Sequence, residues 1–149
     1  MTRRTLAVSL TVALLAACTS ADRDAERLGA RVYGARCASC HGGRGEGAPN
    51  WRSWGPDGRL PPPPHDSTGH TWHHADGLLY RIVVSGTAGA VGDSLHASRY
   101  GMPAFGTLLT PREVHAVLAY IKAGWSSQQR RRQAQVSRDD PFPPAGGTR

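Results

Sequence analysis

The stretch that decides the fold is Cys37-Ala38-Ser39-Cys40-His41, in which two thiols lie three positions apart and an imidazole follows directly. Two thiols at this spacing on a turn can each add to one vinyl group of a haem, and the next residue then brings its imidazole up beneath the iron. Ala38 and Ser39 are small, which suits a segment pressed against the porphyrin. The motif therefore predicts one covalently bound haem c, attached through Cys37 and Cys40, with His41 on the iron.

A Cys-x-x-Cys pair has other uses, namely a structural disulfide, a redox pair or half of a zinc site. A zinc site needs two more ligands, and the chain has three Cys with no second Cys pair. These uses are therefore the weaker alternatives for this motif.

The candidate for a second ligand to the iron is Met102. The chain has two Met, and the other is the initiator Met1. Residues 100–106 read Tyr-Gly-Met-Pro-Ala-Phe-Gly, so glycines on both sides permit close backbone approach and a proline stiffens the turn. A thioether is a soft ligand that favours Fe(II) and raises the reduction potential. A lone Met more often fills a gap in a core, but this loop favours the ligand.

Taken together, the motif at 37–42, the Met-Pro-Ala-Phe stretch at 102–105 and the amphipathic segment that follows resemble a class I monohaem cytochrome c. The resemblance extends over about residues 24–126 and implies an all-α, cytochrome c-like fold, in which helices near the two termini cross and enclose the covalently bound haem. It implies that His41 is the proximal ligand and Met102 the distal ligand. It also implies transfer of single electrons between redox proteins in a respiratory chain, with no small-molecule substrate and no enzymatic activity.

Independently of the resemblance, three segments have helical periodicity. Residues 22–36 carry an apolar face that includes Gly29, a position that would let a second helix approach closely. A middle helix is expected at about 75–85, with Gly86 placed to end it. The third helix begins at the capping box of residues 110–113 and continues with apolar residues at helical spacing. No segment alternates cleanly with period two, so strands are not expected.

A long segment without helical period separates the haem motif from the middle helix. A loop of this length either has a function or wraps around something, and we expect it to follow the haem edge, where two propionates need hydrogen-bond donors. The candidate donors are the indoles of Trp51 and Trp54 and the guanidinium groups of Arg52 and Arg59. Ordinary loop packing is the alternative for each of them.

The same loop carries four histidines, His65, His70, His73 and His74. They could bind copper or zinc, or one of them could displace Met102 from the iron. No carboxylate or Cys completes a clear ligand set, so helix capping and hydrogen bonding are the simpler roles. Two rival functions remain open: a haem-based enzyme or sensor with a labile Met102, and a metal-binding protein that uses residues 65–74.

The amino terminus has the pattern of a targeting segment. Two arginines precede a twelve-residue apolar run over residues 6–17, which is too short to span a bilayer. The run ends in Leu-Ala-Ala-Cys, which resembles the lipobox of bacterial lipoproteins, where cleavage precedes the Cys and the Cys is acylated. We expect a signal peptide at 1–17, a tether at 18–24 lipidated on Cys18, and a protein anchored on the periplasmic or outer face of a membrane. An ordinary secretory signal is the alternative.

Length and charge set the remaining limits. The chain of 149 residues is 39% hydrophobic, so it suits one domain with a small core that a bound group can help to fill. We expect the cytochrome c domain at 25–126. Residues 127–149 have almost nothing to bury, so we expect a disordered tail there. The net charge of +7 lies partly in the leader and this tail, so no nucleic-acid partner is expected.

Overall fold

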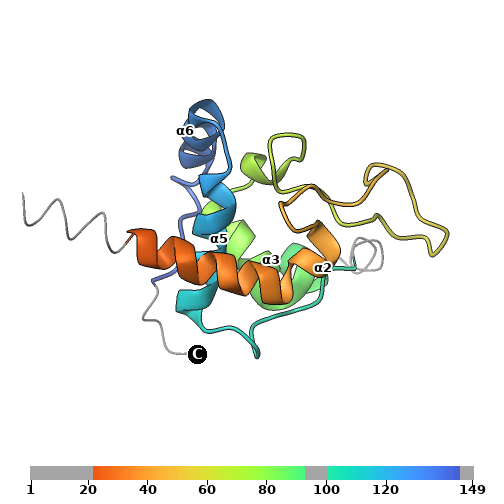
Figure 1. Ribbon diagram of the computed structural model, residues 1–149, viewed down its shortest axis with the longest axis horizontal. Coiled ribbons are helices and arrows are strands. Elements are labelled where there is room, and N and C mark those ends of the chain that lie inside the picture. The colour runs from red at the N-terminus through yellow and green to blue at the C-terminus, as the bar shows by residue number, and fades with distance from the viewer. Residues whose placement is uncertain (1–21, 93–100, 145–149) are drawn as a thin grey trace, which may run out of the picture.

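The computed structural model describes residues 22–92 and 101–144 (Figure 1). These parts of the chain form helices and no β-strand, which confirms the all-α class. The first helix covers residues 22–36, and it is followed by α2 (Ala38–His41), the 3₁₀ helix η1 (Thr71–His73), α3 (Asp76–Val91), α5 (Pro111–Ala123) and α6 (Ser127–Val136). None of the helices in these two ranges is long and apolar enough to cross a membrane.

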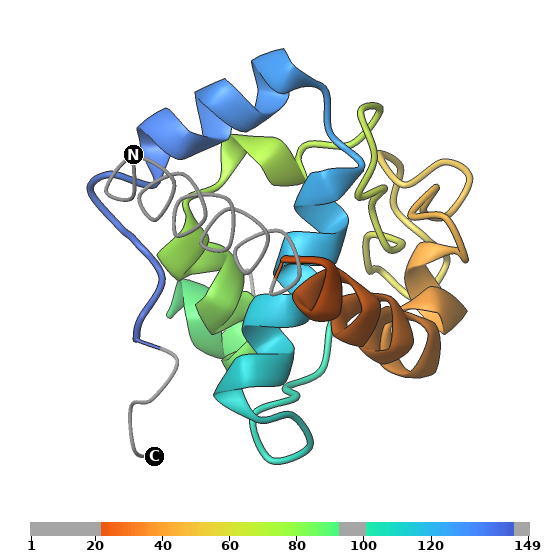
Figure 2. The same ribbon diagram turned by 60° about the vertical axis from the view of Figure 1, so that its left-hand side comes forward.

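The first helix crosses α5 at close range, as Figures 1 and 2 both show. Gly29 is buried at the crossing, where an added Cβ would lie 2.1 Å from the carbonyl oxygen of Ala116 and 2.7 Å from Cβ of Tyr120. Only a residue without a side chain permits this approach. The expectation that Gly29 admits a second helix is therefore confirmed.

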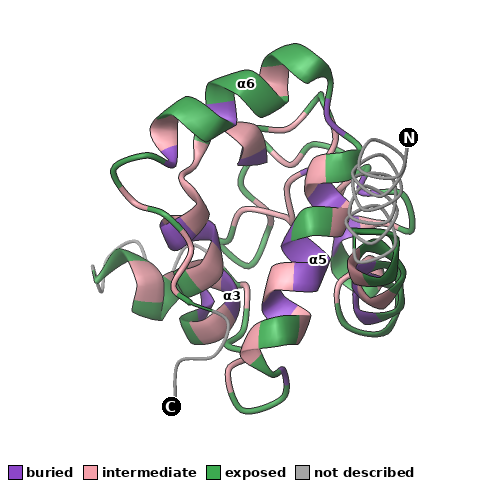
Figure 3. Cartoon of the chain, turned by 90° about the vertical axis from the view of Figure 1, so that its left-hand side faces the viewer, coloured by how far each residue is buried: buried purple, intermediate pink, exposed green. Residues whose placement is uncertain are grey.

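The core lies between this crossing and α3, and its buried residues gather along α5 (Figure 3). α5 begins at the predicted capping box: the Thr110 hydroxyl accepts from the backbone N–H of Glu113, and the Glu113 carboxylate accepts from the N–H of Thr110 at 2.8 Å. The buried cluster consists of Val32, Tyr33, Leu79, Val83, Leu109, Val114, Val117, Leu118, Ile121 and Trp125. It is small, as the composition indicated.

A substitution at the crossing tests this geometry. We expect Gly29→Ala to lower the free energy of unfolding of the haem-loaded protein by about 1–3 kcal/mol, because the new methyl group forces two helix backbones apart. Gly34→Ala is the matched control on the same helix. A Cβ there has no atom within 4 Å, and Ala is about 0.5–1 kcal/mol more favourable than Gly inside a helix. Equal melting temperatures for the two variants would contradict the close crossing.

The middle helix α3 runs past its expected end. Gly86 has φ 70° and ψ 168°, which breaks the helix, but helical conformation resumes and continues to Val91. The predicted end at Gly86 is thus a break inside a longer element. The reason is that the chain after the break finds new hydrogen-bond partners, described below.

The predicted disordered tail is wrong for residues 127–144. The segment 126–144, here called the C-terminal strap, forms α6 and then passes along α3 (Figure 2). α6 begins at a capping box of Ser126 and Gln129, and it packs against η1. Gln133 is only 1% exposed, and its side-chain amide donates to Asp76 at 2.6 Å. The strap is held by buried polar contacts, which a count of apolar residues does not detect.

The strap also caps the start of α3. Ala75, at the N-cap position, has no side chain that can accept from the first N–H groups of the helix. The N–H of Asp76 donates instead to Oγ of Ser137 at 3.1 Å, and the N–H of Gly77 donates to the carbonyl of Asp140 at 2.8 Å. The Asp140 carboxylate also accepts two hydrogen bonds from Arg81, each at 2.9 Å. The strap therefore completes an element of the domain.

Candidate haem-binding site

The two thiols of the haem motif lie where the first helix gives way to α2. Cys37 is half-buried, Cys40 is exposed, and both are free thiols. Burial, together with the neighbouring Cys40, raises the pKa of Cys37 to about 11, so this sulfur is a neutral thiol at neutral pH. The turn thus presents both Cys side chains and the next residue's imidazole on one short segment.

His41 has the environment of an oriented iron ligand. Its ring is 7% exposed, and Nδ1 donates a hydrogen bond to the carbonyl oxygen of Pro63 at 2.9 Å. Because a carbonyl only accepts, Nδ1 carries the proton and Nε2 keeps a free lone pair. Burial lowers the pKa of His41, and the hydrogen bond to Pro63 raises it by less. The net lowering of the pKa keeps the ring neutral. The role of Pro63 as the hydrogen-bond partner of His41 was not predicted from the sequence, although Pro63 lies in the proline run at 61–64.

Met102 lies on the loop between α3 and α5. Its side chain is half-buried and packs against the hydrophobic core, as does that of Phe105. The carbonyl of Phe105 accepts from the N–H of Leu109, so the loop leads directly into the cap of α5. Met102, the predicted second ligand, therefore lies on a loop whose C-terminal end is fixed by the N-terminal cap of α5.

A buried donor without an acceptor provides a test of whether a haem fits. The indole Nε1 of Trp72, on η1, is buried and makes no hydrogen bond in the structure. An orphaned buried N–H is costly, and buried donors are nearly always paired in native proteins. A haem propionate would supply the missing acceptor. The free thiols, the oriented His41 and the orphaned Trp72 indole all fit the cofactor that the sequence predicts.

Residues 27–125 match the cytochrome c family. The chain belongs to the cytochrome c family. Members bind a covalent c-type haem and carry electrons, so this is a haem-binding electron-transfer protein with the cytochrome c fold. The match ends at Trp125, which leaves the C-terminal strap outside it. No curated protein and no solved structure matches the chain.

His65 is part of the surroundings of His41 in this cytochrome rather than of a metal cluster. The two imidazoles are stacked, with ring centroids 4.0 Å apart and planes inclined by 24°. Nδ1 of His65 lies 3.0 Å from Oγ1 of Thr71, and its backbone carbonyl accepts from the indole of Trp125 at 2.7 Å. Burial, with smaller contributions from His41 and His70, lowers the pKa of His65 to about 3. The ring is therefore a neutral, fixed neighbour of His41.

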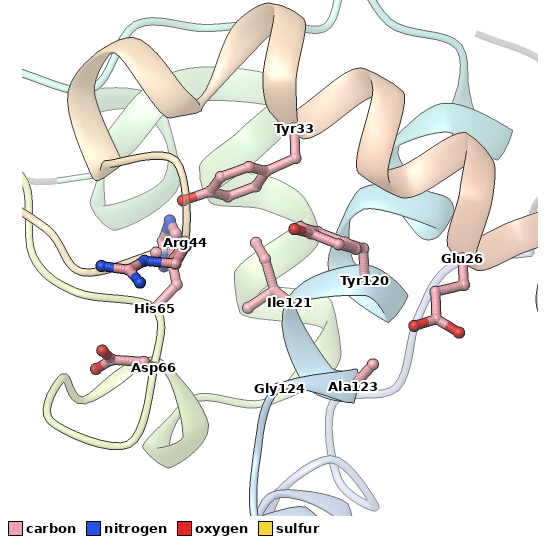
Figure 4. Close-up of a pocket in the computed structure, with 10 residues that line it drawn as sticks. Glu26, Tyr33, Arg44, His65, Asp66, Tyr120, Ile121, Ala123 and Gly124 are labelled. Atoms are coloured by element: carbon pink, nitrogen blue, oxygen red, sulfur yellow. The ribbon is translucent and has the colours of Figure 1, made fainter.

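A pocket in the described parts of the cytochrome lies beside His65 (Figure 4). It measures about 330 Å³ and lies between the first helix, the loop after the haem motif and the end of α5. Tyr33 contributes its ring, and its hydroxyl donates to the carbonyl of Gly42 at 3.0 Å. Neither thiol of the haem motif lines this pocket. His65 therefore borders this open pocket, and the pocket is separate from the residues that attach the haem.

Two of the other loop histidines pack against tryptophans. His70 stacks on Trp51 with ring centroids 5.3 Å apart, and His73 lies over Trp72 at 3.6 Å. Edge contact joins His70 to His74 at 5.2 Å. Within residues 22–92 and 101–144, no group of three or more His, Cys, Asp or Glu is arranged to hold a metal ion. The copper or zinc alternative therefore has no support in the part of the chain described.

The predicted propionate donors lie in varied environments. The Arg52 guanidinium lies 4.1 Å from the centre of the Trp51 ring and donates to the carbonyl of Thr68 at 3.3 Å. Trp54 is 55% exposed. Arg59 is exposed and extends to the Met102 loop, where a Cβ on Gly101 would lie 3.7 Å from its Nη1. The donor best placed by burial is Trp72, which was not among the donors predicted from the sequence, because burial of one indole among four depends on the tertiary fold.

Proposed function

We propose that this chain is a bacterial class I monohaem cytochrome c whose single haem is ligated by His41 and Met102 and which works in an extracytoplasmic respiratory chain. The observation that carries the proposal is the hydrogen bond from His41 Nδ1 to Pro63, which leaves the Nε2 lone pair free for an iron. When bound, the haem supplies a one-electron Fe(III)/Fe(II) couple.

The residues of the chain have distinct roles in this proposal. Cys37 and Cys40 hold the cofactor covalently, so it stays bound in both redox states. The hydrogen bond to Pro63 fixes the ring plane of His41 and increases its donor strength. Met102 contributes a soft sulfur ligand that stabilises Fe(II). No residue in this set needs to transfer a group, which fits a carrier that exchanges electrons with protein partners.

An optical spectrum of the purified ferric protein tests this assignment against the rival enzyme or sensor. A Met-ligated, six-coordinate haem has a weak long-wavelength charge-transfer band, and we expect that band here. An open site gives a high-spin spectrum instead. A high-spin ferric protein that binds peroxide or a gas directly would overturn the carrier assignment and favour the rival class.

The proposed location rests on the Leu-Ala-Ala-Cys ending at residues 15–18, which lies outside the described residues. We propose cleavage before Cys18, acylation of its thiol and anchoring to a membrane on the periplasmic or outer face. A single hydrocarbon chain gives only reversible membrane binding, whereas two or more anchor stably.

For Cys18→Ser we expect either release of the protein from the membrane or retention of residues 1–17, because cleavage and acylation both need the thiol. The measurement is membrane fractionation after a high-salt wash, with the mass of the mature chain. Thr19→Ala keeps the thiol and should fractionate as the wild type does. A Cys18→Ser protein that stays in washed membranes with its leader removed would disprove the lipid anchor.

A further inference from the structure

The break in α3 lies directly against the loop that carries Met102. Gly86 is buried there, with φ 70° and ψ 168°, a conformation essentially restricted to glycine. A Cβ on Gly86 would lie 2.8 Å from the carbonyl oxygen of Met102 and 3.0 Å from the backbone nitrogen of Ala104. Both contacts are with backbone atoms, so a larger residue displaces the loop itself.

The Met102 loop supplies new hydrogen-bond partners for the backbone groups of α3 that lose their partners at the break. In an unbroken helix the carbonyl of Val83 would accept from the N–H of Thr87. Here the Val83 carbonyl accepts from the N–H of Phe105 at 2.9 Å, and the N–H of Thr87 donates to the carbonyl of Met102 at 3.3 Å. The helix is interrupted at one residue, and two hydrogen bonds to the Met102 loop replace the backbone hydrogen bond lost within the helix.

A second glycine allows the same approach from the side of the loop. The N–H of Gly106 donates to the carbonyl of Val84 at 2.9 Å. A Cβ on Gly106 would lie 2.8 Å from Cγ1 and 2.9 Å from the carbonyl oxygen of Val84. One glycine on each segment thus brings two backbones together, and Met102 lies at this junction, with its carbonyl against Gly86.

We propose that Gly86 is a positioning residue for the iron ligand: its backbone conformation opens α3 to the loop and fixes where the Met102 sulfur stands. The inference rests on the proposed ligation by Met102. The loop is held at α3 by the exchanged bonds and at α5 by the cap on Thr110. Met102 is itself part of the first anchor, through its carbonyl, so the position of its sulfur, and with it the strength of the iron–sulfur bond, depends on the break.

The test compares Gly86→Ala with Gly92→Ala in the full, haem-loaded chain. Gly92 also has a positive φ, of 65°, but no atom lies within 4 Å of its Cβ. For Gly86→Ala we expect loss of the charge-transfer band and at least a tenfold gain in affinity of the ferric protein for free imidazole, which competes for the sulfur position. Gly92→Ala should keep both wild-type values, because Ala can adopt the left-handed conformation of Gly92 (φ 65°, ψ 10°) at a modest cost and its Cβ meets no other atom.

A second variant covers the case in which Gly86→Ala does not take up haem. Thr87→Pro keeps Gly86 but removes the N–H that donates to Met102 and places the proline Cδ against the Met102 carbonyl oxygen, at the first residue of the resumed helix. Because the lost hydrogen bond and the new contact both displace the loop, imidazole affinity should rise by at least about twofold. A wild type without the band would refute Met102 ligation itself. A wild type with the band, and wild-type imidazole affinity in both variants, would refute the role of Gly86.

Discussion

Replacing Met102 with His is expected to lower the reduction potential substantially while the iron remains six-coordinate. Imidazole donates to Fe(III) better than a thioether does, so the oxidised state gains stability. Axial ligands tune haem potentials over a range of about 0.8 V, so this is the largest change in potential that we expect from one substitution here. A redox titration measures the shift, and the charge-transfer band should vanish from the ferric spectrum.

Met102→Ala separates loss of sulfur from the gain of a nitrogen ligand. The site should open to give a high-spin ferric haem or recruit a nearby histidine, and again the band should disappear. His65 is a poor substitute, because it is buried against His41 and hydrogen-bonded to Thr71. Leu108→Ala is the control, since Leu108 is 55% exposed on the same loop.

Two results would contradict the axial assignment. If Met102→Ala keeps the band and the potential, sulfur is not on the iron. If the wild type already has a bis-histidine spectrum, a loop histidine is the ligand and the carrier works at a much lower potential.

The second large effect is expected for Cys37→Ala combined with Cys40→Ala. This protein should contain no covalent haem, and its far-ultraviolet circular dichroism should fall close to that of the unfolded chain. The reason is that the buried cluster has ten residues in the described parts of the chain, so the haem would be the largest apolar body in that core. Without it, His41 and the Trp72 indole would be buried polar groups with no iron and no acceptor.

Ser39→Ala is the control for this experiment, because it alters the same turn but keeps both thiols. It should retain haem through denaturation, since the thioether bonds do not involve Ser39. A double-cysteine variant that remains compact and helical without haem would refute the argument that the cofactor completes the core.

Structural features that depend on a few neighbouring residues were predicted correctly from the sequence. The capping box at Thr110 and Glu113 has its predicted hydrogen bonds, because it needs only one turn of helix. Gly29 was identified because it lies on the apolar face of a predicted helix. The structure places the crossing of α5 at this residue. Gly86 was identified as a helix breaker, but its contact with the Met102 loop was not, since the two segments are separated in the chain.

Features that depend on distant partners were not predictable in this way. His65 looked like part of a histidine cluster, whereas the fold stacks it on His41, more than twenty positions earlier. Gln133 lies in the segment that was expected to be disordered, since that segment has little to bury, yet it is buried against Asp76 and Ser137. A polar residue is buried only when a specific partner from elsewhere in the chain satisfies it, and one sequence does not name that partner.

The cap that the strap places on α3 makes one backbone amide a reporter of local opening. The N–H of Gly77 is bonded to the carbonyl of Asp140 and to no residue of its own helix, so it exchanges with solvent deuterium when the strap detaches. Amides in the interior of α5 exchange only through larger opening events. The ratio of the intrinsic exchange rate of an unprotected amide to the rate measured at Gly77 gives the free energy that holds residues 137–144 against the domain, without unfolding the cytochrome.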